Sequence, residues 1–494
     1  MSFPVRWKIT GTLTTDSPLH IGDGDTTERD ALTKENENGK KEKIDISSVI
    51  TDYEDRACIP GSTLKGDLRA WLKRRWANGK LDELLGSEDT KKKDAVGGKA
   101  EFHYAYIKDV KLTNPPPYWD AVRHTGAAAS VAIDRVTRTA SAKKLRHYEF
   151  VPPGVPFTVT ITGSGLDEEE VGILLHALEG FNDPDDPVTL GASTGDGWGR
   201  LSWKLGKVRR ATGEAVREWI KKENQADFPF AELGEDEIDE LKPKAGSPAK
   251  PSIEKIVLDV TLTFDSPFLV NDPSRCPEKK DKEQESDETH PDHAPILDRN
   301  SRAYLPSRSF RGAFRSQAER ILRTLGGDKA ACHSDSDPCC RSLNYPEEVD
   351  RLCPACRLFG AAGWRSPLEV TDFVQAEEEA SGFFQDFLAI DRFTGGGAHG
   401  AKFNALSVLE PRLTGKITVD CSRTEPWMRG LLALTLRDLI EGDITFGFGA
   451  TKGYGASRAE ITGDWWKAEN PQVSEVVEQF RQKIAELQKE AVHG

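Results

Sequence analysis

The chain has 494 residues, of which 37% are hydrophobic and 30% are charged, and its formal net charge is −14 at pH 7. This composition is typical of a soluble globular protein with two to four domains. The sequence has no run of 18 apolar residues and residues 1–4 do not begin a secretory signal, so we expect a cytoplasmic protein without a membrane partner. The negative charge argues against indiscriminate binding of nucleic acid but leaves room for a local basic groove.

The first half begins with a predicted strand at residues 7–14, where polar and apolar residues alternate. A long polar loop is expected at residues 23–47, and a helix should follow Pro60 with Ser62 as a plausible N-cap. A second helix is expected at residues 171–178, before a glycine-rich loop and a closing strand. The apolar face of the first helix would consist of Leu64, Leu68, Trp71 and Leu72.

The second half predicts the same elements in the same order. A strand is expected at residues 253–264, a polar loop at 272–293, a helix capped by Ser307 and a further helix at 431–439. The order strand, helix, strands, helix, strand is the βαββαβ arrangement of ferredoxin-like and RRM-like domains. We therefore expect an α+β protein with two tandem ferredoxin-like domains that carry long loop insertions.

These elements divide the chain into four parts. Residues 1–207 form the first domain, 208–251 a helical and acidic linker, 252–465 the second domain and 466–494 an amphipathic C-terminal helix. Within the linker, residues 214–223 could form a helix. The acidic segments 235–240 and 281–292 are expected to be solvated loops or linkers.

Short motifs repeat at an offset of about 250 residues. Residues 59–69 (IPGSTLKGDLR) return as 305–315 (LPSRSFRGAFR), and 133–137 (IDRVT) return as 390–394 (IDRFT). The glycine-rich residues 191–199 (GASTGDGWG) are echoed by 447–455 (GFGATKGYG). A long, constant offset indicates one duplicated and fused domain rather than a short-period solenoid.

Together with Pro18-Leu19-His20-Ile21-Gly22 and the Leu85-Gly86-Ser87 turn, these motifs resemble the RAMP superfamily. Within it, they are similar to the backbone subunits that line the crRNA in type III CRISPR-Cas effector complexes. The chain looks like two such subunits fused in tandem, as in type III-D-like systems. The resemblance implies a role in antiviral defence, with crRNA, target RNA and other effector subunits as partners: a large polymerase- or nuclease-like subunit and further backbone, cap and small subunits.

The residues themselves also favour RNA binding. Glycines allow a close approach to phosphate, and helix N-termini offer N–H donors to it. Two aromatic residues in the glycine-rich loops, Trp198 and Tyr454, could stack on bases or could instead fill the core. The full set of predicted RNA contacts is Gly61, Ser62, Lys65, Arg69, Arg135, Trp198, Ser307, Arg308, Arg311, Arg315, Arg392, Lys452 and Tyr454.

The resemblance implies that target RNA is cut with the help of an aspartate just before the Pro-Gly-Ser turn. Asp45 is the first candidate, followed by Asp30 and Asp25. In the second half, Asp292 matches the same pattern with one residue missing, and His293 could substitute or assist. Such a carboxylate could hold a hydrated Mg²⁺ near the scissile phosphate or help to deprotonate a ribose 2′-hydroxyl. Otherwise it would be a solvated loop carboxylate.

Five cysteines lie close together in the second half, at Cys332, Cys339, Cys340, Cys353 and Cys356, with His333 beside the first of them. A Cys-x-x-Cys pair with further Cys and His residues nearby is typical of a structural zinc site. The four ligands predicted are Cys353, Cys356, Cys332 and either Cys339 or Cys340. Cys58, Cys276 and Cys421 are isolated and are expected to be buried or incidental thiols.

Two alternatives to target cleavage remain open at this point. The chain could be a purely structural RNA-binding scaffold in which another subunit performs the chemistry. It could also be a guide-processing endoribonuclease, for which His20 is the only reasonable catalytic histidine.

Overall fold

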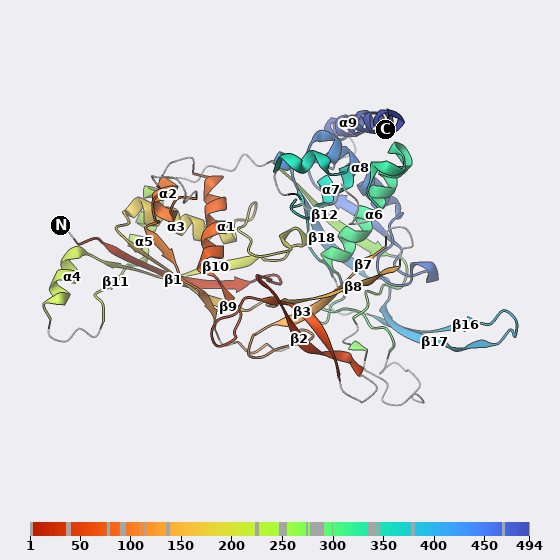
Figure 1. The fold of residues 1–494 in the computed structure, drawn as a ribbon, viewed down its shortest axis with the longest axis horizontal. Helices are drawn as coiled ribbons and strands as arrows, with labels where there is room; N and C mark the ends of the chain where they lie inside the picture. The colour runs from red at the N-terminus through yellow and green to blue at the C-terminus, as the bar shows by residue number, and fades with distance from the viewer. Residues whose placement is uncertain are drawn as a thin grey trace.

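The structure is a computed structural model, and it describes residues 3–35, 41–76, 80–88, 95–108, 110–112, 115–134, 139–222, 227–246, 254–272, 275–276, 291–298, 300–333, 343, 346–376, 381–466 and 470–493. The chain forms two α+β halves that lie side by side (Figure 1). Each half contains one large antiparallel sheet with helices packed against it, and each has its own hydrophobic core.

The sheet of the first half has the ferredoxin-like strand order. Strand β1 (Arg6–Thr15) lies between β10 (Leu201–Ala211) and β9 (Pro156–Ser164), and β9 in turn pairs with β5 (Ala100–Phe102) and β6 (Ala105–Ile107). The short strands β4 (Cys58–Ile59) and β11 (Ala231–Glu232) extend its edges. Helices α1 (Gly61–Lys73), α2 (Lys80–Leu85) and α3 (Glu168–Glu179) cover one face (Figure 1).

Alternation of polar and apolar residues determines which face of this sheet is covered. Trp7, Ile9 and Leu13 of β1 are buried, whereas Lys8, Thr10 and Thr12 are more exposed. The apolar stripe of α1, which includes Leu64 and Leu68, packs onto the same core. Burial of these complementary faces is the main favourable term that holds helix and sheet together.

The second half repeats this arrangement. Strand β12 (Lys255–Phe264) lies between β19 (Ser457–Thr462) and β18 (Arg412–Asp420), and β18 pairs with β14 (Leu368–Val370) and β15 (Phe373–Gln375). Strand β13 (Tyr304–Leu305) lies at the edge, and helices α6 (Ser307–Gly326) and α8 (Pro426–Glu441) cover the sheet. The prediction of two tandem ferredoxin-like domains is thus confirmed.

The expectation of a polar loop at residues 23–47 is wrong. Strands β2 (Gly22–Glu35) and β3 (Lys41–Val49) form a hairpin there, which continues into a four-stranded sheet through β8 (Ala140–Phe150) and β7 (Gly126–Ile133). The part of β2 whose burial is described, residues 22–30, is mostly exposed, so its polar sequence lacks the strong alternation of a half-buried strand. Residues 273–274 and 277–290, in the predicted loop of the second half, lie outside the described residues.

The acidic segment at residues 235–240 is not a solvated linker. It begins α5 (Glu235–Lys244), which packs against α3 with Ile238 and Leu241 buried. The indole nitrogen of Trp76 donates a hydrogen bond of 3.2 Å to the carbonyl of Ala245 at the end of this helix. Nearby, α4 (Gly213–Ile220) forms the helix expected around residues 214–223. Of the second acidic segment, residues 281–290 lie outside the described residues.

The N-caps of the two repeated helices also differ from the prediction. Pro60 and Pro306 occupy the cap positions of α1 and α6, and Ser62 and Ser307 lie inside the helices. A proline in this position has a preset φ and lacks only an N–H that the helix does not need. Ser307 is therefore available for a contact outside its own helix.

The last helix, α9 (Pro471–His493), packs against α8 at the C-terminal end of the chain (Figure 1). Val476, Phe480 and Ile484 of α9 are buried in the second core. Gly430 of α8 permits this close approach, because a Cβ atom there would lie 2.1 Å from the carbonyl oxygen of Val476. In the part of the chain that the structure describes, no helix is long and apolar enough to span a membrane.

Candidate RNA-binding surface and cysteine cluster

The glycine-rich loop of the first half forms the joint between the halves. Within it, the 3-10 turn η2 (Thr194–Asp196) lies at the start of α6. The carboxylate of Asp196 pairs with Arg311 and, at 3.2 Å, with Arg308, while the hydroxyl of Ser307 donates a 2.6 Å hydrogen bond to the Asp196 carbonyl. Arg308 also donates to the hydroxyl of Ser193 at 2.7 Å. Three predicted RNA contacts, Ser307, Arg308 and Arg311, are therefore engaged by protein.

Two further ion pairs join the halves. Arg200, which directly follows the glycine-rich loop, pairs with Glu369 of β14 at 2.5 Å. At the beginning of β12, Lys255 pairs with Asp186 of the first half at 2.9 Å. Hydrogen bonds from Arg75 and Lys255 hold the pKa of Asp186 well below its ordinary value, although burial opposes this. The carboxylate of Asp186 is therefore ionised at neutral pH and can maintain its hydrogen bonds with Arg75 and Lys255.

The two glycine-rich loops have the same backbone conformation. Gly197 and Gly199 have φ values of 74° and 75°, and their counterparts Gly453 and Gly455 have 82° and 75°. A Cβ atom at Gly199 would lie 1.9 Å from the carbonyl oxygen of Leu190, and a Cβ at Gly455 would lie 1.9 Å from that of Phe446. The packing of the chain against itself therefore requires these glycines, whether or not a phosphate approaches them.

Protein contacts bury both aromatic residues of these loops. Trp198 packs against Phe150 and has the guanidinium of Arg308 4.3 Å from its ring centre. Tyr454 is 2% exposed and donates a 2.8 Å hydrogen bond to Gln385. Base stacking by either ring remains a prediction that would require these contacts to open.

Arg69 and Arg315 hold equivalent turns. Arg69 donates a 2.5 Å hydrogen bond to the carbonyl of Gly86, and Arg315 donates a 3.1 Å bond to that of Gly360. Both glycines follow short helices, α2 in the first half and α7 (Pro354–Phe359) in the second. The arginines thus have a structural role, and RNA contact by them stays a prediction.

Other predicted RNA contacts are open to solvent. Ser62, Arg392 and Lys452 are exposed, and Lys65 is partly exposed with no ion pair to any described residue. Gly61 is buried, and a Cβ atom there would lie 2.0 Å from the carbonyl oxygen of Phe102, so the position admits no side chain. Arg135 lies outside the described residues.

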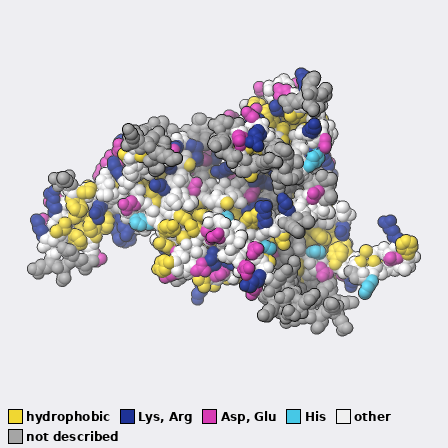
Figure 2. Space-filling model, viewed as in Figure 1, with side chains coloured by type: hydrophobic (Ala, Val, Ile, Leu, Met, Phe, Trp, Pro, Cys, Tyr) yellow, Lys and Arg dark blue, Asp and Glu magenta, His cyan; other side chains and the backbone are white. Residues whose placement is uncertain are grey.

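The described residues of the repeated Ile-Asp-Arg motifs lie at the ends of two hairpins. The first is the end of β7 before β8, and the second is the turn between β16 (Gly382–Ile390) and β17 (Gly397–Val408), a hairpin that projects from the body (Figure 1). Ile133 and Ile390 are 54% and 59% exposed, and Phe393 is fully exposed. Exposed apolar side chains at the end of a projecting hairpin are typical of a contact surface. Figure 2 shows hydrophobic and basic side chains along the second hairpin.

Asp45 lies on a strand rather than in a loop. It is an exposed residue of β3, directly opposite Glu28 of β2. Directly opposed residues of an antiparallel pair have side chains on the same face, so the two carboxylates are neighbours. The other candidates, Asp30 and Asp25, lie on the exposed strand β2.

Asp292 does not occupy the register position of Asp45. Both halves contain the same bridge just before their Pro-Ser or Pro-Gly turn, at Thr51 in the first and Leu297 in the second. Counting back five residues from each bridge leads to Ile46 and to Asp292. Because neighbouring residues of a strand point to opposite faces, the missing residue places Asp292 on the face opposite to that of Asp45.

Asp292 also has a structural partner. Its backbone N–H donates a 2.8 Å hydrogen bond to the side-chain oxygen of Asn404, and the Asn404 N–H donates a 2.9 Å bond to the Asp292 carboxylate. The adjacent His293 is half-buried against Phe403 and Phe448, and this burial lowers its pKa. The carboxylate therefore ties residues 291–298 to β17.

A buried carboxylate that the sequence did not reveal organises the first half around β3. Glu149 of β8 is fully buried and pairs with Arg29 and, at 2.8 Å, with Arg123. It also accepts hydrogen bonds from the hydroxyl of Thr125 at 2.6 Å and from the N–H of Val49 at 2.8 Å. Such a network is costly to break, because each partner would be left buried and unpaired.

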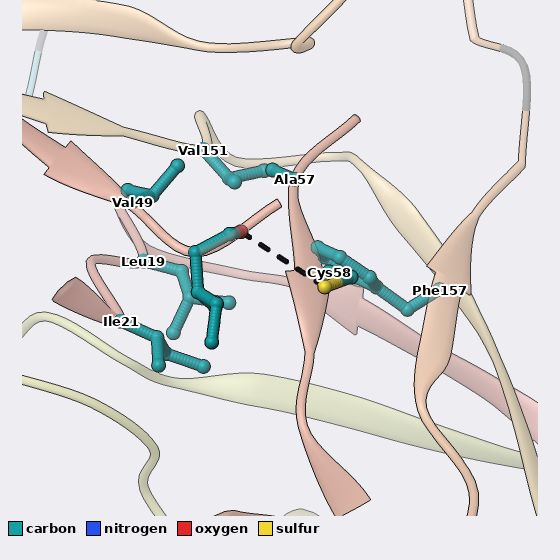
Figure 3. A pocket seen from close by; sticks show the side chains of 8 residues that line it. Leu19, Ile21, Val49, Ala57, Cys58, Val151 and Phe157 are labelled. Carbon is teal, nitrogen blue, oxygen red and sulfur yellow. Dashed lines mark hydrogen bonds between the residues drawn. The ribbon is translucent and has the colours of Figure 1, made fainter. Parts of the chain in front are cut away.

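The remaining sequence candidates have structural surroundings. His20 is buried, with its Nδ1 atom 2.7 Å from the carbonyl oxygen of Glu149. A small apolar hollow lies nearby, lined by aliphatic side chains, Phe157 and Cys58 (Figure 3). Burial raises the pKa of Cys58 to about 11, so this thiol is protonated at neutral pH. The lining carries no charged group and does not resemble a catalytic pocket.

Three of the clustered cysteines meet in the second half. The sulfur atom of Cys332 lies 3.6 Å from that of Cys356 and 3.7 Å from that of Cys353. Zinc–sulfur bonds of about 2.3 Å in a tetrahedron place sulfur atoms about 3.8 Å apart, whereas a disulfide bond is about 2.05 Å long. The cluster therefore fits a thiolate-bound metal ion. Cys339 and Cys340 lie outside the described residues.

The surroundings of the cluster also fit thiolate ligands. Arg315 donates a 3.1 Å hydrogen bond to the sulfur of Cys356. Hydrogen bonding with Cys332 raises the pKa of Cys353 to about 11, and a bound metal ion would reverse this effect by stabilising the thiolate. His333 is turned to Asp328 at 3.1 Å and is not among the grouped side chains.

We expect Asp196→Ala to loosen the joint between the halves by about 2–3 kcal/mol, because two guanidinium groups lose a shared carboxylate. Hydrogen exchange of the full-length protein should show faster exchange at the start of α6. The matched control is Lys452→Ala at the equivalent position of the second loop, which should leave that exchange unchanged. Equal exchange in both variants would contradict the role of Asp196.

The geometry of the two halves agrees with a comparison to protein families. The family model described as RAMP superfamily matches residues 12–202 and 261–458, one stretch in each half. No curated protein matches the chain. The matched stretches cover more than half of the sequence and include strands of both ferredoxin-like sheets. The chain therefore belongs to the RAMP superfamily.

Proposed function

We propose that this protein is a crRNA-binding backbone subunit of a type III CRISPR-Cas effector complex that cleaves guide-paired target RNA. Membership of the RAMP superfamily suggests a CRISPR-associated RNA-binding protein. The observation that carries the finer proposal is the duplication, since both halves present the same sheet and a hairpin that ends at an exposed isoleucine, Ile133 or Ile390. Two equivalent surfaces in a fixed relation suit a ligand with a repeating backbone.

The hairpin tips are the best candidates for contact with the guide–target duplex. Ile133, Ile390 and Phe393 would supply apolar surface, and Arg392 would supply a cation for phosphate. Lys and Arg side chains are interspersed with acidic ones over the visible face of the body (Figure 2). With a net charge of −14, binding would therefore depend on local contacts rather than on a broad positive field.

For cleavage we propose Asp45 as the acting carboxylate of the first half. It is exposed on a strand whose position the buried Glu149 network secures. Its carboxylate could orient or deprotonate a ribose 2′-hydroxyl of a bound target strand. Among the described residues, only the cysteine cluster brings three potential metal ligands together. A Mg²⁺ ion at Asp45 would therefore need RNA phosphates and water as its other ligands, which is usual for this ion.

For the second half, Asp292 is the corresponding proposal, although its different register and its bonds to Asn404 make the two halves chemically unequal. Because of this inequality, the alternative that the second half is a scaffold without catalysis has more support than it has for the first half. Guide processing by His20 has less support, because that ring is buried and bonded to a backbone carbonyl.

We further propose that the cysteine cluster binds a structural zinc ion. Cys332, Cys353 and Cys356 would supply three thiolates, and Cys339 or Cys340 the fourth. Zinc would supply no chemistry to RNA cleavage, since it would be closed by four protein ligands and would serve to hold residues 332–356 together.

In the assembled complex, Asp45→Ala should reduce one target-RNA cut by at least about 100-fold, because a positioned base or metal ligand is lost. Binding of guide and target should persist, since an exposed carboxylate contributes little to folding. Mapping the cuts on labelled target RNA with Mg²⁺ measures this. Asp30→Ala is the matched control and should cut normally. If Asp45→Ala cuts like wild type, Asp45 is not the catalytic residue.

Asp292→Ala should remove a second cut, but it should also destabilise the second half by about 1–2 kcal/mol, because the Asn404 N–H loses its acceptor. Asp292→Asn retains an acceptor and separates the two effects. Restored stability with a missing cut would support catalysis, whereas restored stability with all cuts present would support the scaffold alternative.

The full-length protein should contain one zinc ion per chain after purification without chelators. Cys353→Ser with Cys356→Ser should release it and increase proteolysis near residues 332–356, because metal binding and local folding are coupled. Elemental analysis and limited proteolysis provide the two measurements. The control is Cys421→Ser, an isolated thiol whose loss should leave the zinc in place. Absence of stoichiometric zinc from the wild-type protein would refute the proposal.

A further inference from the structure

One cation lies beside Asp45 on the exposed face of the four-stranded sheet. Strands β3 and β8 run parallel, with Ile46 next to His147. Asp45 directly precedes the first of these residues and Arg146 the second, so both side chains lie on the face opposite to that of the buried Ile46. Because neighbouring strands are about 4.8 Å apart, Asp45 and Arg146 are lateral neighbours.

The two side chains are not neutralised by protein. Glu28, the residue opposite Asp45 on β2, is paired with Lys43 at 3.1 Å. Asp45 and Arg146 are both exposed, and neither has an ion pair with any described residue. The face therefore presents a carboxylate and a guanidinium on adjacent strands, each open to a ligand.

The buried Glu149 fixes the strands that carry these two groups. It belongs to β8, three positions after Arg146, and it accepts a 2.8 Å hydrogen bond from the N–H of Val49 at the end of β3. Its ion pairs with Arg29 and Arg123 add two further anchors. A cation whose strand is held in this way is preorganised, and a fixed charge of this kind is what stabilises a developing negative charge most effectively.

The second half has no equivalent cation. Val151 after β8 and Val408 of β17 form equivalent bridges, because each pairs with the residue after the Ser-Pro of its own half. Counting back five residues from each bridge leads to Arg146 and to Phe403. Phe403 is neutral, and its ring stacks on that of Phe387. The pair of opposite charges is therefore confined to the first half.

We propose that Arg146 is a catalytic residue of the first half and binds the phosphate at which the target RNA is cut. This inference rests on the proposed cleavage at Asp45. A ribose 2′-hydroxyl and the phosphate attached to the same sugar are neighbouring groups, so two residues on adjacent strands can reach both of them. The charges are also matched to the two groups, since the carboxylate takes a proton and the guanidinium binds an anion.

The reaction forms one bond and breaks one. The 2′-hydroxyl oxygen attacks the adjacent phosphorus atom, and its proton passes to the Asp45 carboxylate. The bond from phosphorus to the 5′-oxygen of the next nucleotide breaks, and that oxygen takes a proton from water, which leaves a 2′,3′-cyclic phosphate. Arg146 donates hydrogen bonds to the non-bridging phosphate oxygens, whose negative charge grows during the attack.

The test uses the assembled complex with guide RNA, at concentrations that saturate target binding. Arg146→Ala should slow the cut that depends on Asp45 by at least about 100-fold in a single turnover and leave any other cut unchanged. Arg146→Lys should restore it only in part, because an ammonium group keeps the charge but not the planar fork of donors. Guanidinium ion at a concentration far below that which unfolds proteins should speed the cut by Arg146→Ala but not that by Asp45→Ala.

The matched control is Arg217→Ala, which removes the same charge from the exposed side of α4 and should cut at the wild-type rate. The thermal stability of Arg146→Ala should equal that of wild type, since an exposed side chain without an ion pair adds little to it. A cut that is lost together with stability would assign Arg146 a structural role and overturn the inference.

The remaining outcomes separate this inference from the proposed function. The inference is overturned if Arg146→Ala cuts normally while Asp45→Ala does not, or if saturation with target removes the defect of Arg146→Ala. If Asp45→Ala cuts normally and Arg146→Ala does not, Asp45 is the wrong carboxylate and the role of Arg146 stands. A wild-type complex in which neither residue affects any cut overturns both.

Discussion

The contact of one carboxylate with two guanidinium groups determines how this molecule is assembled. Asp196 reaches from the first half to Arg308 and Arg311 at the start of α6, and neighbouring groups add hydrogen bonds from Ser307 and to Ser193. The three charged side chains are largely buried in this contact. Removing Asp196 would leave two guanidinium groups without their shared carboxylate and with little access to water. The relative position of the two halves depends on this contact together with the ion pairs of Arg200 and Lys255.

The same contact changes how the duplicated motifs are understood. Arg308 and Arg311 have the residue types and the helix position expected of phosphate ligands, yet the carboxylate of Asp196 in the other half already pairs with both of them. Their counterparts Ser62 and Lys65 have no such neighbour among the described residues. Duplication thus preserved the fold while the equivalent surfaces took different roles, one internal and one facing outward.

Sequence patterns were sufficient for the fold because the periodicity of buried residues is strong in β1, β12 and the helices that cover them. They failed at residues 23–47, where a mostly exposed hairpin lacks that periodicity. The repeated motifs also predicted that Asp292 corresponds to Asp45. Only the strand register shows that Asp292 is shifted by one residue and corresponds to Ile46. The four partners of the Glu149 side chain come from three separate segments, so no local pattern could have indicated them.

The covalent connection between the halves has a consequence for the energetics of their joint. Helix α5 packs on the first half, and ten residues separate its end from the start of β12, where Lys255 pairs with Asp186. The loop at residues 191–199 and the start of α6 therefore meet at a high effective concentration. The translational entropy that two separate subunits would lose on association does not oppose this contact, because the halves are covalently linked. Separate subunits would have to recover that entropy from a larger or more apolar interface. A fused pair can be held by a few polar contacts and also has a fixed one-to-one ratio of its two unequal halves at any expression level.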